Sequence, residues 1–550
     1  RNPKLKRTIA VEIIPQTGAI SAVPSLSGRS KRRAAFAYGP RQWMGLFLGP
    51  LLFVGVGWAL RSAGLGSEAR WAAATVALMS AWWIAEPLPL WATAALPLIL
   101  FPLTGVASFF AVALQYFDPI NFLFLGGMFI AGAMEQWGLH RRIALSVIAN
   151  IGTSPRRIVL GFMLATGFIT LWISNTATAM MMFPIGMAVL WKFEEETAPD
   201  DPLLRRFGLA LMLGIAYAAS IGGVGTKIGT GPNLVFVKQA SGILGHEVDF
   251  LTWLKVGMPL VIVAIPLVWL YLVRVAAPLP PTGFTAGQRA VLEERARLGS
   301  MSLGERVALI AFLTAAFLWI FRKDIELGAF TIPGWWKLVP FSWEDVLGRP
   351  VKTLPAPLAK MLAQDVGDSA VAFVVGTVLF LVPVARRPWR FALELRMARH
   401  LSWDMLVLLG GSFAMAYGIQ VSGLSEWLAS LLQGVGKLSP FLALLLVSGI
   451  SVGLSEVASN TATASILLPL LAASAHSFGL HPAPLMFAAT LAASFGFMLP
   501  AGTPPNAIVF SSGYISVPQM ARSGLIVDLF GGLLIAIVCW LLAPWALGIR

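Results

Sequence analysis

The hexapeptide Ser174-Asn175-Thr176-Ala177-Thr178-Ala179 occurs twice, because the same six residues stand at 459–464. The surrounding residues repeat as well, and in the same order: Gly126-Gly127 returns as Gly410-Gly411, Ala218-Ala219-Ser220 as Ala492-Ala493-Ser494, and Gly229-Thr230-Gly231-Pro232-Asn233 as Gly502-Thr503-Pro504-Pro505-Asn506. Four matches in one order predict that the chain consists of two copies of one structural unit.

Composition places both copies in a membrane. Of the 550 residues, 57% are hydrophobic and 12% are charged, whereas an average soluble domain is about 25% charged. Apolar runs recur from Met44 to Leu547, and each needs about 20 residues to cross a bilayer as a helix that satisfies its own backbone. The net charge of +14 comes from basic residues in short loops, where they set topology rather than bind nucleic acid.

The basic loops also predict the path of the chain. Helices near 44–62, 71–86, 88–107 and 119–138 lead from a cytoplasmic tail back to the cytoplasm. The stretch 158–192 has basic residues near both ends, so we expect it to be a re-entrant hairpin whose tip is Ser174-Asn175-Thr176. On this path helix 119–138 runs inward and its counterpart 403–421 runs outward, so the two repeats are inverted.

The predicted fold is an all-α membrane protein with about eleven transmembrane helices and two re-entrant hairpins, in an inverted-repeat transporter arrangement with an external C-terminus. Its expected parts are a cytoplasmic tail 1–42, N-terminal helices 43–118, a first repeat 119–250, linking helices 251–402 with an external loop 323–368, a second repeat 403–522, and a last helix 523–550.

The repeated motifs have the chemistry of an ion site. Two hydroxyls and a carboxamide offer donors to an anion and oxygens to a cation, and half-helix N-termini add partial positive charge. Glycine and proline in Gly-Thr-x-Pro-Asn open a helix and present its carbonyl oxygens. Thr170 and Ser455 stand one turn before the triplets, so the symmetry predicts two cation sites flanking one anion. A single such triplet would indicate interhelical hydrogen bonding, but its duplication favours a binding site.

These residues resemble the divalent anion/sodium symporters, a family of sodium-dependent dicarboxylate, citrate and sulfate carriers. The resemblance covers about residues 44–547 and rests on both triplets and both helix breaks. It implies a scaffold, formed by 43–118 and part of 251–402, and a moving transport domain, an elevator-type cycle, a homodimer, and a place in a bacterial-type inner membrane.

The resemblance also implies roles for single residues. Substrate contacts are expected at Ser174, Asn175, Thr176, Thr230, Gly231, Ser459, Asn460, Thr461, Thr503 and Pro504. One sodium ion is expected near Thr170, Ser174, Asn175 and Gly229, and the other near Ser455, Ala458, Asn460 and Gly502.

Two charged residues lie within these apolar motifs. Lys227 precedes Gly229 by two residues, and an ammonium at membrane depth is costly. It either snorkels to an interface or stands in for a bound sodium, which would reduce the coupling stoichiometry or make the protein an exchanger. Glu456 lies three residues before Ser459, where it carries a proton, balances a cation, or pairs with a hydroxyl or with Lys227.

The sequence therefore predicts a secondary active transporter of small divalent anions, C4-dicarboxylates above all, coupled to sodium. The alternatives are a sodium-independent dicarboxylate exchanger and a sulfate transporter. An enzyme is not expected, because the five histidines fall at loops or helix ends and no His-Glu-x-x-His motif occurs. A passive channel would need a continuous pore, which midplane hairpins would block.

Overall fold

The computed structural model describes residues 39–152, 154–196, 201–281, 286–327, 330–338, 353, 367–386, 388–399, 401–431, 439–475 and 480–549. The chain divides into two units, Arg1–Gly39 and Pro40–Arg550, and every element below belongs to the second unit. The predicted tail 1–42 lies almost wholly outside the described residues, as does most of the predicted loop 323–368.

The described chain opens with a series of helices: α1 (Pro40–Ala59), η1 (Leu60–Ala63), α2 (Ser67–Ala85), α3 (Leu90–Ala94), α4 (Pro97–Thr104) and α5 (Phe109–Tyr116). Gly64 follows η1 with a φ of 70°, a left-handed conformation that suits glycine, and the chain reverses so that α1 packs along α2. The helix predicted over 88–107 is present over Leu90–Thr104, but a turn at Ala95 and Leu96 interrupts it. Pro97 has no backbone N–H to continue a helix, so the apolar run splits into α3 and α4.

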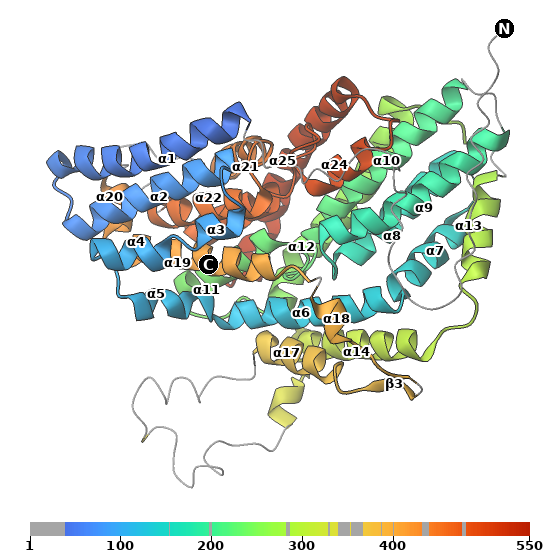
Figure 1. Ribbon diagram of the computed structural model, residues 1–550, viewed down its shortest axis with the longest axis horizontal. Coiled ribbons are helices and arrows are strands. Elements are labelled where there is room, and N and C mark those ends of the chain that lie inside the picture. Colours follow the sequence, from blue (N-terminus) through green and yellow to red (C-terminus); the bar gives the residue numbers. More distant parts are fainter. Residues whose placement is uncertain are drawn as a thin grey trace. The chain divides into compact units, whose positions relative to one another are not determined.

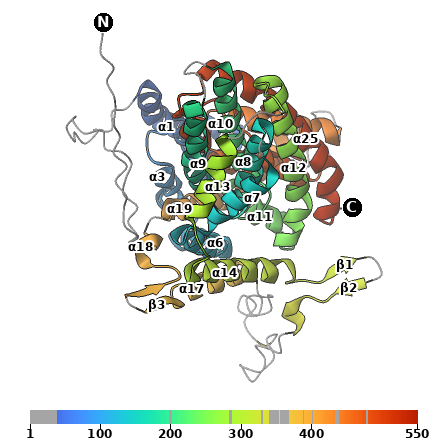
Figure 2. The same cartoon turned by 90° about the vertical axis from the view of Figure 1, so that its right-hand side faces the viewer.

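Three helices, which we call the α6 group, pack on one another: α6 (Pro119–Gln136), α14 (Leu303–Ile320) and α17 (Asp368–Val378). Both views show them side by side (Figure 1, Figure 2). Glycine allows the close approach, since a Cβ on Gly126 of α6 would lie 2.2 Å from the carbonyl carbon of Ala372.

Two antiparallel hairpins depart from the all-α prediction. β1 (Ile325–Leu327) pairs with β2 (Phe330–Ile332), and β3 (Pro383–Arg386) pairs with β4 (Trp389–Phe391). They follow α14 and α17 of the α6 group, in segments that carry charged residues. The remaining short elements here are η3 (Trp335–Leu338) and α18 (Leu395–Ala398).

The two repeats form the same series of elements. The first contains α8 (Pro155–Thr170), α9 (Asn175–Glu196), α10 (Pro202–Gly223) and α11 (Gly231–Leu244). The second contains α21 (Pro440–Ser455), α22 (Asn460–Ser474), α23 (Pro482–Ala492) and α24 (Pro504–Phe510). Helix ends leave backbone groups without intrahelical partners, so each series offers free polar groups at a tight turn and at a longer break.

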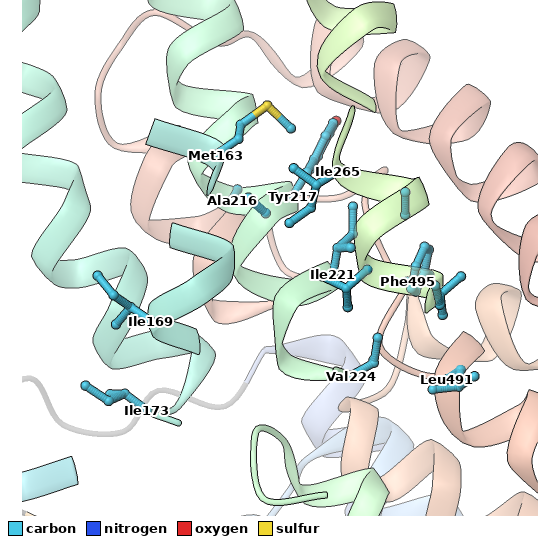
Figure 3. Packing of buried hydrophobic residues seen from close by; sticks show 14 of the residues in the cluster. Met163, Ile169, Ile173, Ala216, Tyr217, Ile221, Val224, Ile265, Leu491 and Phe495 are labelled. Atoms are coloured by element: carbon cyan, nitrogen blue, oxygen red, sulfur yellow. The ribbon is translucent and has the colours of Figure 1, made fainter. Parts of the chain in front are cut away.

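The other helices surround these series: α7 (Leu139–Ile151), α12 (Phe250–Tyr271), η2 (Leu272–Ala276), α13 (Ala286–Arg297), α19 (Trp403–Val421), α20 (Leu424–Leu431) and α25 (Val517–Ala546). α10 is the most enclosed, since every residue from Phe207 to Gly223 is buried. Figure 3 shows Tyr217 and Ile221 of α10 in the same packed region as Phe495 of the second break. The rings of Tyr217 and Phe497 have centroids 4.6 Å apart, so the two repeats share one core.

Eight helices in the described part of the chain are long and apolar enough to cross a membrane: Pro40–Ser62, Phe109–Gln136, Asn175–Glu195, Pro202–Gly223, Phe250–Ala276, Leu303–Ile320, Trp403–Val421 and Val517–Ala546. Five shorter apolar helices accompany them: Leu90–Thr104, Asp368–Val378, Pro440–Ser455, Asn460–Ser474 and Pro482–Ala492. The chain is thus a multi-pass helical membrane protein. The count of eleven spanning helices and the re-entrant hairpins stay predictions.

Candidate functional site at the two broken helices

Each Ser-Asn-Thr triplet lies in a turn between two helices, the first between α8 and α9 and the second between α21 and α22. The serine caps the second helix of each pair. Ser174 Oγ accepts a hydrogen bond from the Ala177 N–H at 3.3 Å, and Ser459 Oγ accepts one from the Ala462 N–H at 3.2 Å. The asparagine is the first helical residue, so its side chain lies beside backbone N–H groups that have no partner within the helix.

In the first repeat, polar groups gather around the end of α8. Thr170 Oγ1 lies 2.8 Å from Asn175 Oδ1 and 2.9 Å from the carbonyl oxygen of Ala219. One hydroxyl proton can serve only one of these acceptors at a time, and the hydroxyl lone pairs remain available. A Cβ on Gly223 would lie 2.4 Å from Asn175 Oδ1, and one on Gly229 would lie 2.4 Å from the Gly223 carbonyl oxygen. The structure therefore brings Thr170, Asn175 and Gly229 together.

The second repeat reproduces this arrangement. Ser455 Oγ lies 3.0 Å from Asn460 Oδ1 and 2.5 Å from the carbonyl oxygen of Ala493. Ala493 corresponds to Ala219 in the aligned repeats, so the same three groups meet in both copies. Ala458 is buried in the same turn.

The asparagine of each Gly-Thr-x-Pro-Asn motif ties its break together. Asn233 Nδ2 donates to the carbonyl oxygens ten and seven residues earlier, those of Gly223 and Thr226, at 3.1 and 2.7 Å. Asn506 Nδ2 donates to the carbonyl oxygens ten and seven residues before it, at 3.0 Å each. The break thus has a defined structure in both repeats, because one side chain replaces the missing intrahelical partners.

Among the buried side-chain oxygens that have no hydrogen-bond partner in the described part of the chain, six form matching pairs in the two repeats: Thr178 and Thr463, Ser220 and Ser494, Asn233 Oδ1 and Asn506 Oδ1. A buried polar atom without a partner is costly. Oxygen atoms are also the ligands that hard cations take in proteins. The hydroxyl, carboxamide and carbonyl oxygens that meet at Thr170 and at Ser455 are a donor set that fits an alkali cation.

Contacts between the repeats join the two sites. α11 packs against α22, and α9 packs against α24. A Cβ on Gly231, the first residue of α11, would lie 2.5 Å from Thr461 Oγ1 and 2.9 Å from Met405 Cε of α19. The first break therefore meets the second triplet, as a shared substrate site requires.

The remaining predicted substrate residues lie at the same helix ends. Thr230 and Thr503 are the N-cap residues of α11 and α24, and Thr503 Oγ1 accepts a hydrogen bond from the Asn506 N–H at 3.4 Å. Pro504 is the exposed first residue of α24, and Thr176 is half-buried at the start of α9.

Comparison with known proteins agrees with this geometry. The family model described as the sodium:sulfate symporter transmembrane region matches residues 41–547. The chain belongs to this family. Its members are transporters, in agreement with the prediction that the chain is not an enzyme.

Two similar proteins and one solved structure extend the comparison. The sodium-dependent dicarboxylate transporter SdcS of Staphylococcus saprophyticus is 38% identical over 525 residues, which are 94% of this chain and 95% of that protein. SdcS of Staphylococcus aureus strain MRSA252 is 37% identical over 524 residues, which are 95% of this chain and 94% of that protein. The YdaH transporter of Alcanivorax borkumensis has a TM-score of 0.50 and 16% identity over 79% of this chain and 88% of its own, a likeness of fold alone.

Lys227 of this family member is covered by protein, since its side chain is 1% exposed. Its ammonium lies 2.7 Å from Asp368 Oδ2, 3.6 Å from Glu247 Oε1 and 2.9 Å from the carbonyl oxygen of Val248. The proposed pairing with Glu456 is also wrong, because Asp368 is the close partner. None of these contacts is with a predicted sodium ligand, so the structure gives no support to Lys227 as a substitute for sodium.

Sequence reasoning missed Asp368, Arg322 and Glu247. Arg322 Nε lies 2.8 Å from Asp368 Oδ1, and its Nη2 lies 2.7 Å from Glu247 Oε2. Burial opposes the ionised form of Glu247, but Lys227 and Arg322 hold the pKa of this carboxyl below its ordinary value. One feature of the sequence could have indicated Asp368: it stands directly before an apolar run, at the end of the segment 323–368 that is predicted to be a loop.

Glu456 binds the second break. Its carboxylate accepts hydrogen bonds from the N–H groups of Met498 and Leu499, at 2.8 and 3.1 Å. Asp528 of α25, which sequence reasoning also missed, accepts one from the Phe497 N–H at 3.3 Å. A Cβ on Gly502 would lie 3.0 Å from Glu456 Oε2, so the carboxylate lies beside a predicted sodium ligand.

Proposed function

We propose that this chain is a secondary active transporter that moves C4-dicarboxylates across the membrane together with sodium. The observation that carries the proposal is the matched pair of oxygen clusters, in which Thr170, Asn175 and Ala219 have the same contacts as Ser455, Asn460 and Ala493. The printed names of the SdcS relatives, sodium-dependent dicarboxylate transporters, support the same cation and the same class of anion.

Each cluster supplies the ligands that a sodium ion needs. Hydroxyl, carboxamide and backbone carbonyl oxygens are neutral, so they hold a monovalent cation without trapping it as a carboxylate ring would. Thr170, Ser174, Asn175 and Gly229 form one proposed site; Ser455, Ala458, Asn460 and Gly502 form the other. Glu456 supplies negative charge close to the second site.

The anion is proposed to bind between the clusters. The N-termini of α11 and α22 meet where Gly231 approaches Thr461, and both helix ends attract negative charge. Sodium bound on either side would strengthen this attraction, so that cation and anion bind together. Hydroxyl groups of the two triplets and of Thr230 and Thr503 would orient the carboxylates.

The proposed cycle is an elevator, in which the bundle of repeat helices carries the site past a scaffold in a homodimer. The proposal includes eleven spanning helices, two re-entrant hairpins that enter from opposite faces, a cytoplasmic N-terminus and an external C-terminus. Pseudo-twofold matching of the two clusters supports it, because inverted repeats can exchange conformations to open the site to either side.

The test is uptake of labelled succinate into proteoliposomes under an inward sodium gradient, beside potassium-only vesicles and vesicles preloaded with succinate. Asn175→Ala and Asn460→Ala each remove a carboxamide oxygen from one cluster. Asn150→Ala, an exposed asparagine on α7, is the matched control. We expect sodium-driven accumulation in the parent and the control, and its loss in both cluster variants.

Two other outcomes would contradict the proposal. Uptake that ignores sodium and requires internal succinate would make the protein an exchanger. Accumulation of labelled sulfate, with succinate unable to compete, would assign it to sulfate instead.

A further inference from the structure

A buried network of four charges connects the first helix break with the α6 group. Lys227 lies in the break, and Glu247 lies in the loop between α11 and α12. Arg322 follows α14, and Asp368 begins α17. The side chains of Lys227, Arg322 and Asp368 are 1%, 2% and 0% exposed, and that of Glu247 is 37% exposed. Charges buried this deeply persist only when they are paired.

The closest ion pairs join the α6 group to the helices of the two repeats with α12 and α25, which we call the repeat bundle. Lys227 Nζ is 2.7 Å from Asp368 Oδ2, and Arg322 Nη2 is 2.7 Å from Glu247 Oε2. Figure 2 shows α6, α14 and α17 together in the lower part of the view, with α10, α11 and α12 above them. Each close pair therefore joins a residue of the repeat bundle to a residue of the α6 group.

The repeat bundle and the α6 group each also contain one basic and one acidic residue of the network that lie close to each other. Lys227 and Glu247, both between α10 and α12, approach to 3.6 Å. Arg322 Nε and Asp368 Oδ1, both on the side of the α6 group, approach to 2.8 Å as an ion pair without hydrogen-bond geometry. If the repeat bundle and the α6 group separate, these four charges divide into two neutral pairs, so each of the four keeps a partner of opposite charge. This is the property that a reversible contact inside a membrane protein requires.

Two further ion pairs join the repeat bundle to the α6 group. Lys323, after α14, lies 3.2 Å from Asp249 at the start of α12, and Lys238 of α11 pairs with Asp118 at the start of α6. The second break has Pro500 at the position that corresponds to Lys227. In the described residues, the carboxylates that contact the second break are those of Glu456, at the C-terminal end of α21, and Asp528 of α25, and both belong to the repeat bundle.

We propose that Lys227, Glu247, Arg322 and Asp368 form a latch that holds the first break against the α6 group in this conformation and opens when the site changes its exposure. The inference rests on the proposed transport cycle, to which it adds the contact that sets the rate of alternation. The latch can open within the cycle because each of the four charges exchanges a partner across the contact for a partner on its own side.

The test compares two charge-balanced variants, Lys227→Gln/Asp368→Asn and Arg322→Gln/Glu247→Gln, because each removes one pair between the repeat bundle and the α6 group without leaving a net charge. Glu247 is partly exposed, so the Arg322→Gln/Glu247→Gln variant can be used if the Lys227→Gln/Asp368→Asn variant does not fold. Arg141→Gln/Glu294→Gln, an ion pair on α7 and α13, is the control. Spin labels at Ile243→Cys and Val374→Cys, both exposed, report the separation of α11 and α17 in a Cys539→Ala background.

We expect either balanced variant to increase the population with separated labels by about threefold or more relative to the parent. The initial uptake rate should change by a similar factor while half-saturating succinate stays within about twofold, because the latch acts on alternation and not on the site. The control should match the parent in both measurements.

Parental distances and parental rates in the balanced variants would overturn the latch while leaving transport intact. The distance measurement needs no transported solute. A parent that fails to accumulate succinate therefore overturns the proposed function, and the label distances still decide whether the contact opens.

Discussion

Thr170 and Ser455 each contribute one hydroxyl to an oxygen cluster. Replacing Thr170 with valine or Ser455 with alanine removes that oxygen and leaves the packing nearly unchanged. A hydrogen bond of this kind contributes about 1 kcal/mol, so half-saturating sodium should rise by about threefold to tenfold. Succinate affinity at saturating sodium should hold. The measurement is the sodium dependence of initial succinate uptake.

The control for this experiment is Thr104→Val, because Thr104 Oγ1 donates to the Leu100 carbonyl oxygen at 2.7 Å within α4, away from both clusters. Its sodium dependence should equal that of the parent. If Thr170→Val and Ser455→Ala behave like this control, the two hydroxyls do not bind the cation.

Single residues differ in how far the sequence predicts them. Thr170 and Asn175 are five positions apart, so local spacing was sufficient to bring them together. Lys227 and Asp368 are 141 positions apart, and no local pattern joins them. Charge in an apolar segment marks a residue as unusual, but its partner depends on how distant helices pack.

At the scale of helices, the ends of α10 and α9 meet without room for one more carbon atom. A Cβ added by Gly223→Ala would lie 2.4 Å from Asn175 Oδ1, which would push the carboxamide out of its cluster. We expect succinate uptake to fall at least about tenfold, with the protein still produced and folded. Uptake and the thermal unfolding of the purified protein measure the two effects separately.

Gly242→Ala provides the matched substitution, because Gly242 is on α11 and its added Cβ would meet nothing within 4 Å. Alanine in an open helical position favours the helix by about 1 kcal/mol. This variant should transport like the parent. Equal loss of uptake in both variants would show that the effect is not specific to the cluster.

Helices were predicted well where the sequence carries a physical constraint. Glycine and proline in Gly-Thr-x-Pro-Asn cannot continue a helix, and α10 and α11 are separate on either side of that motif. The prediction of an uninterrupted helix over 88–107 did not include the turn between α3 and α4, which precedes Pro97. Hydropathy shows how long an apolar segment is, but it does not show that a proline in the segment has no backbone N–H for the helix.

For the whole molecule, the repeat was visible in the sequence because identical motifs recur in one order. The family followed from the same motifs. The α6 group was not visible, since α6, α14 and α17 come from separate parts of the chain and join through small residues such as Gly126. Close approach of glycine-bearing helices is a property of surfaces in three dimensions, and the sequence alone does not pair one such surface with another.

The proposed orientation in the membrane can be tested on the whole molecule with single cysteines in the Cys539→Ala background. Lys337, 68% exposed, lies in the segment 323–368 proposed to be external, and the exposed Arg295 lies on α13, in a basic segment that we propose is cytoplasmic. In intact cells a membrane-impermeant maleimide should label Lys337→Cys. It should label Arg295→Cys only after the membrane is permeabilised, because basic loops are retained on the cytoplasmic side. The reverse pattern would invert the orientation of every helix, and with it the face from which each hairpin is proposed to enter.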